Sequence, residues 1–98
     1  MDLHIETFRA DCTDKEAAVK VLEEASEARE AWQVLTRGAV LDSMTHQPPI
    51  TEHRRMRLAD ELADCITACA NLADRYGIDL QDALDRVERH NRERGRYE

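Results

Sequence analysis

Residues 58–76 of the chain read LADELADCITACANLADRY, and this stretch decides the fold class. Its apolar side chains recur every three or four positions, which is the spacing of one face of an α-helix. The break Gln47-Pro48-Pro49 and an N-cap at Thr51 predict where this helix begins, and Gly77 predicts that it ends at Tyr76. The residues of the apolar face are Leu58, Leu62, Cys65, Cys69, Leu72 and Tyr76.

A second amphipathic helix is predicted upstream. Thr13 and Glu16 have the spacing of a capping box, in which the hydroxyl of the first residue caps the helix and the carboxylate three positions later reaches back. The helix is expected to run to about Arg37, with Gly38 in the left-handed position that ends it. Residues 39–50 then connect the two long helices, with a short turn at 39–41. The apolar arc of this helix comprises Ala17, Val21, Ala25, Ala28, Trp32 and Leu35.

A third helix is predicted from Asp79, a good N-cap, to about Arg94. Three helices without β-branched or aromatic runs indicate an all-α fold, an antiparallel helix bundle formed by one domain over residues 1–98. A chain of 98 residues buries a thin core, so we expect oligomerisation, as a homodimer or homotetramer, to complete it.

Composition limits the classes of partner. The net charge of −7 argues against binding a nucleic acid polymer, which requires an excess of Lys and Arg. No segment has the length of a membrane span or the pattern of a signal peptide, so a cytoplasmic protein is expected. Cys65 and Cys69 lie in the apolar pattern and, with Cys12, lack paired zinc spacing, so we expect two buried free thiols in a reducing compartment.

Four carboxylates lie beside the apolar arcs. With 100° per residue, Glu24 falls inside one flank of the first arc and Glu27 at its edge, while Glu61 and Asp64 occupy matching positions on the second helix. If the two helices pack antiparallel, the four acids converge. A divalent cation would offset their repulsion, and oxygen ligands without histidine favour Mg²⁺, or Mn²⁺, over zinc. The alternative is an ordinary solvated acidic surface, which is the usual place of Glu and Asp.

At these residues the sequence resembles the all-α nucleotide pyrophosphohydrolases, the MazG-like proteins and their relatives. Their EExxE signature is matched by residues 23–27 and their ExxD signature by residues 61–64, in the same order and on consecutive helices. The resemblance covers roughly residues 16–95. It implies that Glu24, Glu27, Glu61 and Asp64 ligate Mg²⁺, and that a nucleoside triphosphate is cleaved to the monophosphate and pyrophosphate.

The resemblance also implies roles for single residues. Glu24 and Glu27 are the expected catalytic residues, with Glu27 taking a proton from the attacking water. Asn71, Asn91 and Arg94 are the expected substrate contacts. Two departures bear on specificity: the segment between the motifs is longer than in relatives, and Val87 stands where relatives often have Lys. Trp32 is expected to pack in the core or between subunits.

Two alternatives stay open. The first is a related hydrolase that acts on phosphoribosyl-ATP, because that family has the same helical fold and a similar acidic signature. The second is a non-catalytic helical oligomer or adaptor, against which the four matched carboxylates argue.

Overall fold

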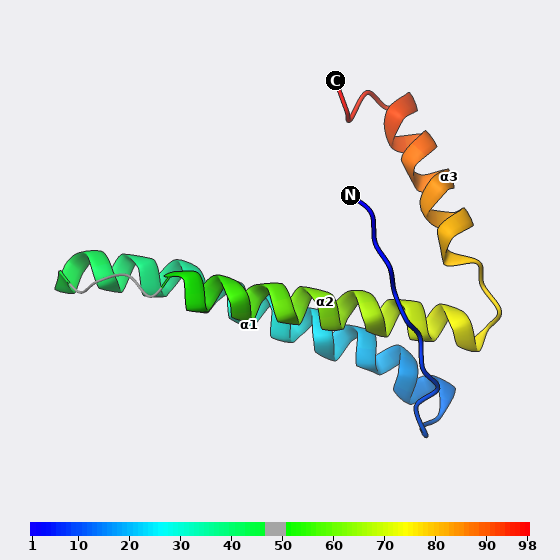
Figure 1. The fold of residues 1–98 in the computed structure, drawn as a ribbon, viewed down its shortest axis with the longest axis horizontal. Helices are drawn as coiled ribbons and strands as arrows, with labels where there is room; N and C mark the ends of the chain where they lie inside the picture. Colours follow the sequence, from blue (N-terminus) through cyan, green and yellow to red (C-terminus); the bar gives the residue numbers. More distant parts are fainter. Residues whose placement is uncertain (47–50) are drawn as a thin grey trace.

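The computed structural model describes residues 1–46 and 51–98, and in these ranges the regular structure is helical, without a strand (Figure 1). Helix α1 spans Asp14–Thr45, α2 spans Thr51–Arg75 and α3 spans Leu80–Glu93. Helices α1 and α2 run antiparallel along each other and form a long hairpin. The all-helical prediction is therefore confirmed. The break predicted at 47–49 lies outside the described residues, and Thr51 is the first residue of α2 instead of its N-cap.

The start of α1 follows the predicted capping box. The Thr13 hydroxyl oxygen accepts a hydrogen bond from the Glu16 backbone N–H at 3.1 Å and donates to the Glu16 carboxylate at 3.0 Å. The first bond satisfies a backbone N–H that an uncapped helix leaves without a partner, whereas the second joins the two side chains.

The predicted end of α1 at Arg37 and Gly38 is wrong, as is the separate turn at 39–41. The helix continues to Thr45 and ends at His46, which adopts the left-handed conformation (φ 57°) and donates its N–H to the Asp42 carbonyl. Gly38 has a packing role instead, because a Cβ there would collide with the guanidinium of Arg54. That guanidinium crosses α1 and binds the Asp42 carboxylate at 2.6 Å.

The junction between α2 and α3 has the bonding pattern of a Schellman motif. Gly77 is left-handed (φ 62°), its N–H donates to the Asp74 carbonyl at 3.1 Å, and the Ile78 N–H donates to the Ala73 carbonyl at 3.0 Å. Asp79 then caps α3 by accepting from the Asp82 N–H, as predicted. The chain is thereby turned away from the hairpin, and α3 buries no residue.

The core between the helices consists of small side chains. The buried apolar residues are all alanines, and no large side chain among the described residues is fully buried. The accessible surface is 8068 Å², whereas a compact protein of 11.3 kDa exposes about 5,700 Å². The radius of gyration is 17.2 Å against about 13 Å for a compact domain of this length. The chain thus leaves apolar surface exposed that a compact domain would bury. The buried alanines are Ala28, Ala31, Ala68, Ala70 and Ala73.

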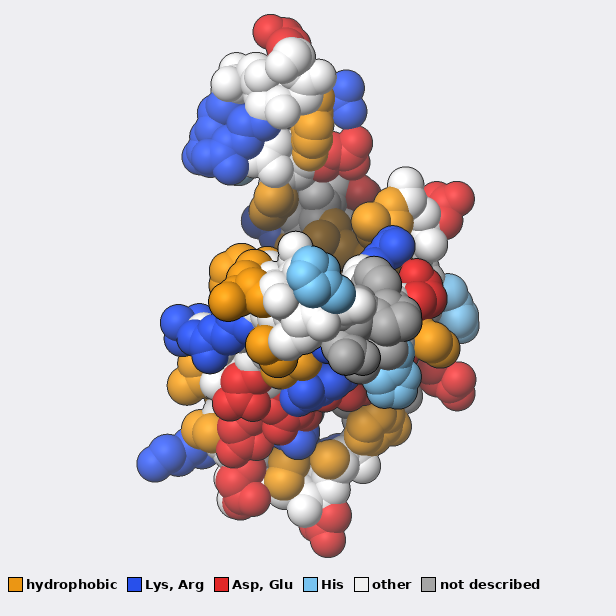
Figure 2. Space-filling view, turned by 90° about the vertical axis from the view of Figure 1, so that its left-hand side faces the viewer, with side chains coloured by type: hydrophobic (Ala, Val, Ile, Leu, Met, Phe, Trp, Pro, Cys, Tyr) orange, Lys and Arg blue, Asp and Glu red, His pale blue; other side chains and the backbone are white. Residues whose placement is uncertain are grey.

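Exposed apolar side chains occur on the hairpin and on α3. Figure 2 shows hydrophobic side chains at the surface of the hairpin end and of α3, which stands clear of it. Trp32, expected in a core or an interface, is 51% exposed. The expectation of two buried thiols is wrong, because Cys69 is exposed and Cys65 is half-buried. None of the described helices combines the length and hydropathy required to cross a membrane.

Candidate metal centre and its cavity

Three of the four predicted carboxylates meet in the middle of the hairpin. Glu24 of α1 and Glu61 and Asp64 of α2 each offer an oxygen, and these oxygens all lie within 4.8 Å of one another. The carboxylates have the predicted order of burial, since Glu24 is buried, Glu61 is half-buried and Asp64 is exposed. The predicted apolar face of α2 is wrong as a core face, because Leu62, Cys69 and Tyr76 are exposed. The antiparallel packing of α1 and α2 brings the two matched positions together.

Two oxygens of this cluster have no hydrogen-bond partner. They are Oε2 of Glu24 and Oε2 of Glu61, and both atoms are buried. Glu24 is only 7% exposed, so little water reaches its carboxylate. A buried carboxylate oxygen without a donor is costly, and a cation shared between the two helices would satisfy both atoms. The donor set, three carboxylates and no nitrogen or sulfur, suits Mg²⁺ or Mn²⁺.

Glu27 lies at the edge of the cluster. Its side chain is exposed, and it is not one of the three closest ligands. Its pKa is nevertheless raised above the ordinary value, first by the negative charge of Glu24, then by desolvation and by Glu61. A carboxylate whose pKa is raised in this way is a stronger base towards a nearby proton than an isolated Glu.

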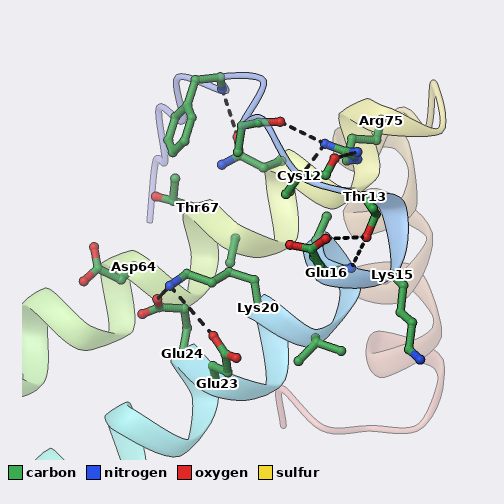
Figure 3. Close-up of a pocket in the computed structure, with 16 residues that line it drawn as sticks. Cys12, Thr13, Lys15, Glu16, Lys20, Glu23, Glu24, Asp64, Thr67 and Arg75 are labelled. Carbon is green, nitrogen blue, oxygen red and sulfur yellow. Dashed lines mark hydrogen bonds and ion pairs between the residues drawn. The ribbon is translucent and has the colours of Figure 1, made fainter.

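Among the described residues, Lys20 forms the ion pair with the cluster. Its ammonium lies 2.9 Å from Oε1 of Glu24 and 4.0 Å from Glu23 (Figure 3). The hydrogen bond to Glu24 is the main reason that the pKa of Lys20 is raised above its ordinary value. Lys20 balances one of the clustered charges and leaves the two orphaned oxygens unsatisfied.

A cavity of about 860 Å³ opens beside the cluster, within the size range of small-molecule sites. Glu24 and Asp64 form one end of it, and Arg75 and Cys12 lie at the other (Figure 3). Helices α1 and α2 form two walls of the cavity, and the N-terminal segment, residues 8–13, which crosses α2, forms the third.

This N-terminal wall is held by two side chains of α2. Arg75 donates to the carbonyls of Cys12 at 2.6 Å and Ala10 at 3.3 Å and pairs with Asp14 at 3.0 Å. Asn71 accepts from the Phe8 backbone N–H at 2.9 Å. The cavity is therefore built from both helices of the hairpin and from the segment before α1.

The predicted substrate contacts divide into two groups. Asn71 lines the cavity, in line with its expected place on the face of Asp64. Asn91 and Arg94 do not line it, because α3 projects away from the hairpin (Figure 1). Within one chain they are not brought to the carboxylates.

Lys20, Arg75 and Phe8 belong to the site but were not predicted from the sequence. The spacing of Lys20 four residues before Glu24 is a pattern that could have indicated their ion pair. No local pattern places Phe8 against α2, since Phe8 and its partner Asn71 are 63 residues from each other along the chain. Comparisons of the chain with models of protein families, with curated proteins and with solved structures give no match.

Proposed function

We propose that the protein is a Mg²⁺-dependent nucleotide pyrophosphohydrolase that converts a nucleoside or deoxynucleoside triphosphate to the monophosphate and pyrophosphate. The observation that carries the proposal is the pair of buried, partnerless oxygens on Glu24 and Glu61, which lie with Asp64 next to a cavity of nucleotide size. A module that only packs against partners gains nothing from desolvating these acids. The resemblance to the MazG-like hydrolases points to the same residues.

The ion would be held by Glu24, Glu61 and Asp64, with Glu27 at the edge of the site. When bound, it supplies the positive charge that lets phosphate oxygens approach carboxylates and that stabilises charge developing on them. Oxygen-rich sites of this kind suit Mg²⁺, which commonly shares its coordination between carboxylates and substrate phosphates.

The side chains around the ion have separate tasks. Glu27, whose pKa is raised first by the charge of Glu24, accepts the proton as water oxygen bonds to the α-phosphorus. The bond from that phosphorus to the bridging oxygen breaks, and pyrophosphate leaves with the bonding electrons. Lys20 is within reach of the same end of the cavity, where its ammonium can pair with a phosphate.

We further infer that a second copy of the chain completes the core, as a homodimer or a dimer of dimers. On the helical wheel, Trp32 of α1 and Leu62, Ile66 and Tyr76 of α2 lie on the side of the hairpin opposite the cavity. Each of these side chains is at least 39% exposed. An apolar strip of this kind on two adjacent helices is typical of subunit contacts. Asn91 and Arg94 do not line the cavity of their own chain, so a role as substrate contacts would require the site of a second copy.

We also infer a cytoplasmic location, because the free cysteines suit a reducing compartment.

The test is hydrolysis of a panel of nucleotides, including phosphoribosyl-ATP, with Mg²⁺ or Mn²⁺, with pyrophosphate measured separately from phosphate. The variants Glu24→Gln and Asp64→Asn are compared with Glu30→Gln, which removes an exposed acid on the same helix as Glu24. We expect pyrophosphate release that is lost in the first two variants and kept in the third. Absence of turnover for every compound would refute the proposal and favour a helical interaction module.

A further inference from the structure

The N-terminal segment supplies the cavity with an aromatic side chain that its own packing does not explain. Phe8, the one Phe of the sequence, lines the cavity and is 62% exposed. Its position is set by its backbone, because its N–H donates to Asn71, while Arg75 holds the carbonyls of Ala10 and Cys12. An exposed aromatic ring fixed at the wall of a cavity is suited to stacking on a planar ligand.

The residues of α2 along the cavity follow the order of the parts of a nucleotide. Asp64, Thr67 and Asn71 all line it, and a helix rises about 1.5 Å per residue. Asn71 is therefore about 10 Å from Asp64 along the helix axis. This is roughly the reach from a phosphate across a sugar to the far edge of a base.

Asn71 also has a defined hydrogen-bonding direction. Its Oδ1 accepts from the Phe8 N–H, and no hydrogen bond among the described residues engages its Nδ2, so Nδ2 is available to a ligand. Nδ2 is a donor, and it suits a base whose edge carries an acceptor. Thr67 donates its hydroxyl to the Ala63 carbonyl and so offers the cavity an acceptor.

We propose that the N-terminal segment is the base-binding wall of the site, in which Phe8 stacks on the base and Asn71 Nδ2 donates to its edge. The inference rests on the proposed function, since the phosphates are held by the carboxylate cluster. It assigns the recognition of the nucleoside to Phe8, which precedes the first helix, and to Asn71 of α2, both outside the two acidic motifs.

The test measures binding by calorimetry, with Mg²⁺ present, of non-hydrolysable triphosphates of the four common bases and of tripolyphosphate, which has no base. Proteins with Phe8→Ala and Phe8→Trp are compared with the unmodified chain, after circular dichroism has shown that all three melt alike. We expect Phe8→Ala to weaken nucleotide binding on the order of tenfold. Tripolyphosphate binding should be unchanged, and Phe8→Trp should keep nucleotide affinity.

The remaining outcomes separate the two proposals. Nucleotide affinity that is equal in the unmodified and Phe8→Ala proteins, or that falls equally for tripolyphosphate, would overturn the base-binding wall and leave the metal site intact. The same holds if the unmodified chain binds tripolyphosphate as tightly as any nucleotide. Failure of the unmodified chain to bind either ligand would refute the proposed function, and this inference with it.

Discussion

Replacing Glu61 by Gln should stabilise the metal-free protein and remove its response to Mg²⁺. Glu61 has no ion pair among the described residues, and its carboxylate shares a region of 4.8 Å with those of Glu24 and Asp64. Two unit charges at that distance repel by about 3.5 kcal/mol at an effective dielectric constant of about 20. Lys20 offsets part of the charge of Glu24, and solvent screens the exposed Asp64, so we expect a net gain of about 1–2 kcal/mol.

The assay is thermal unfolding at fixed protein concentration, in chelator and in Mg²⁺. A gain of 1 kcal/mol raises the melting temperature of a domain of this size by about 4–8 °C, so the Glu61→Gln protein should melt at least about 5 °C higher in chelator. Mg²⁺ at about 100 times its Kd adds about 2.7 kcal/mol to the unmodified protein, and this increment should be absent in the variant.

Glu30→Gln is the matched control for that experiment, because it removes the same charge from an exposed position outside the cluster. It should leave both melting temperatures nearly unchanged. A Glu61→Gln protein that melts at or below the unmodified temperature in chelator, and that Mg²⁺ still stabilises, would refute the electrostatic reasoning.

Three further predictions follow from single contacts. Arg54→Ala should lower the free energy of unfolding by about 2–3 kcal/mol in denaturant titrations, because it takes the guanidinium from the largely buried Asp42; the control Arg55→Ala, at an exposed ion pair, should cost under about 1 kcal/mol. Because folding raises the pKa of Glu27, its contribution to metal-free stability should fall as pH rises through the ordinary and then the raised value. Melting curves at about pH 4 and pH 7 should show that difference and its reduction in Glu27→Gln, and equal pH dependence of both proteins would contradict it. The emission of Trp32 should shift to shorter wavelength as protein concentration rises, whereas a spectrum independent of concentration would argue against the proposed dimer.

Local signals in the sequence predicted the parts of the fold that local chemistry determines. The hydroxyl of Thr13, the carboxylate of Asp79 and the freedom of Gly77 to adopt positive φ each act within a few residues. The convergence of Glu24 with Glu61 was also predictable, because helical periodicity gives the face of each residue and antiparallel packing then brings equivalent faces together.

The errors arose where distant residues decide the structure. Gly38 has the pattern of a helix end, but it lies within α1, where the guanidinium of Arg54 occupies the space that a Cβ would fill. The wall formed by Phe8 depends on Asn71 and Arg75, which are more than sixty residues away. Periodicity places Trp32 on the apolar face of its helix, but it does not show whether the same chain or a second copy covers that face.

A titration with Mn²⁺ followed by electron paramagnetic resonance tests the central claim most directly, because the signal of the free ion falls as the ion binds. We predict saturable binding by the unmodified protein, competition by Mg²⁺, and loss of that binding in Glu24→Gln but not in Glu30→Gln. Binding that is absent in the unmodified protein, or equal in both variants, would contradict the assignment of the carboxylate cluster as a metal site.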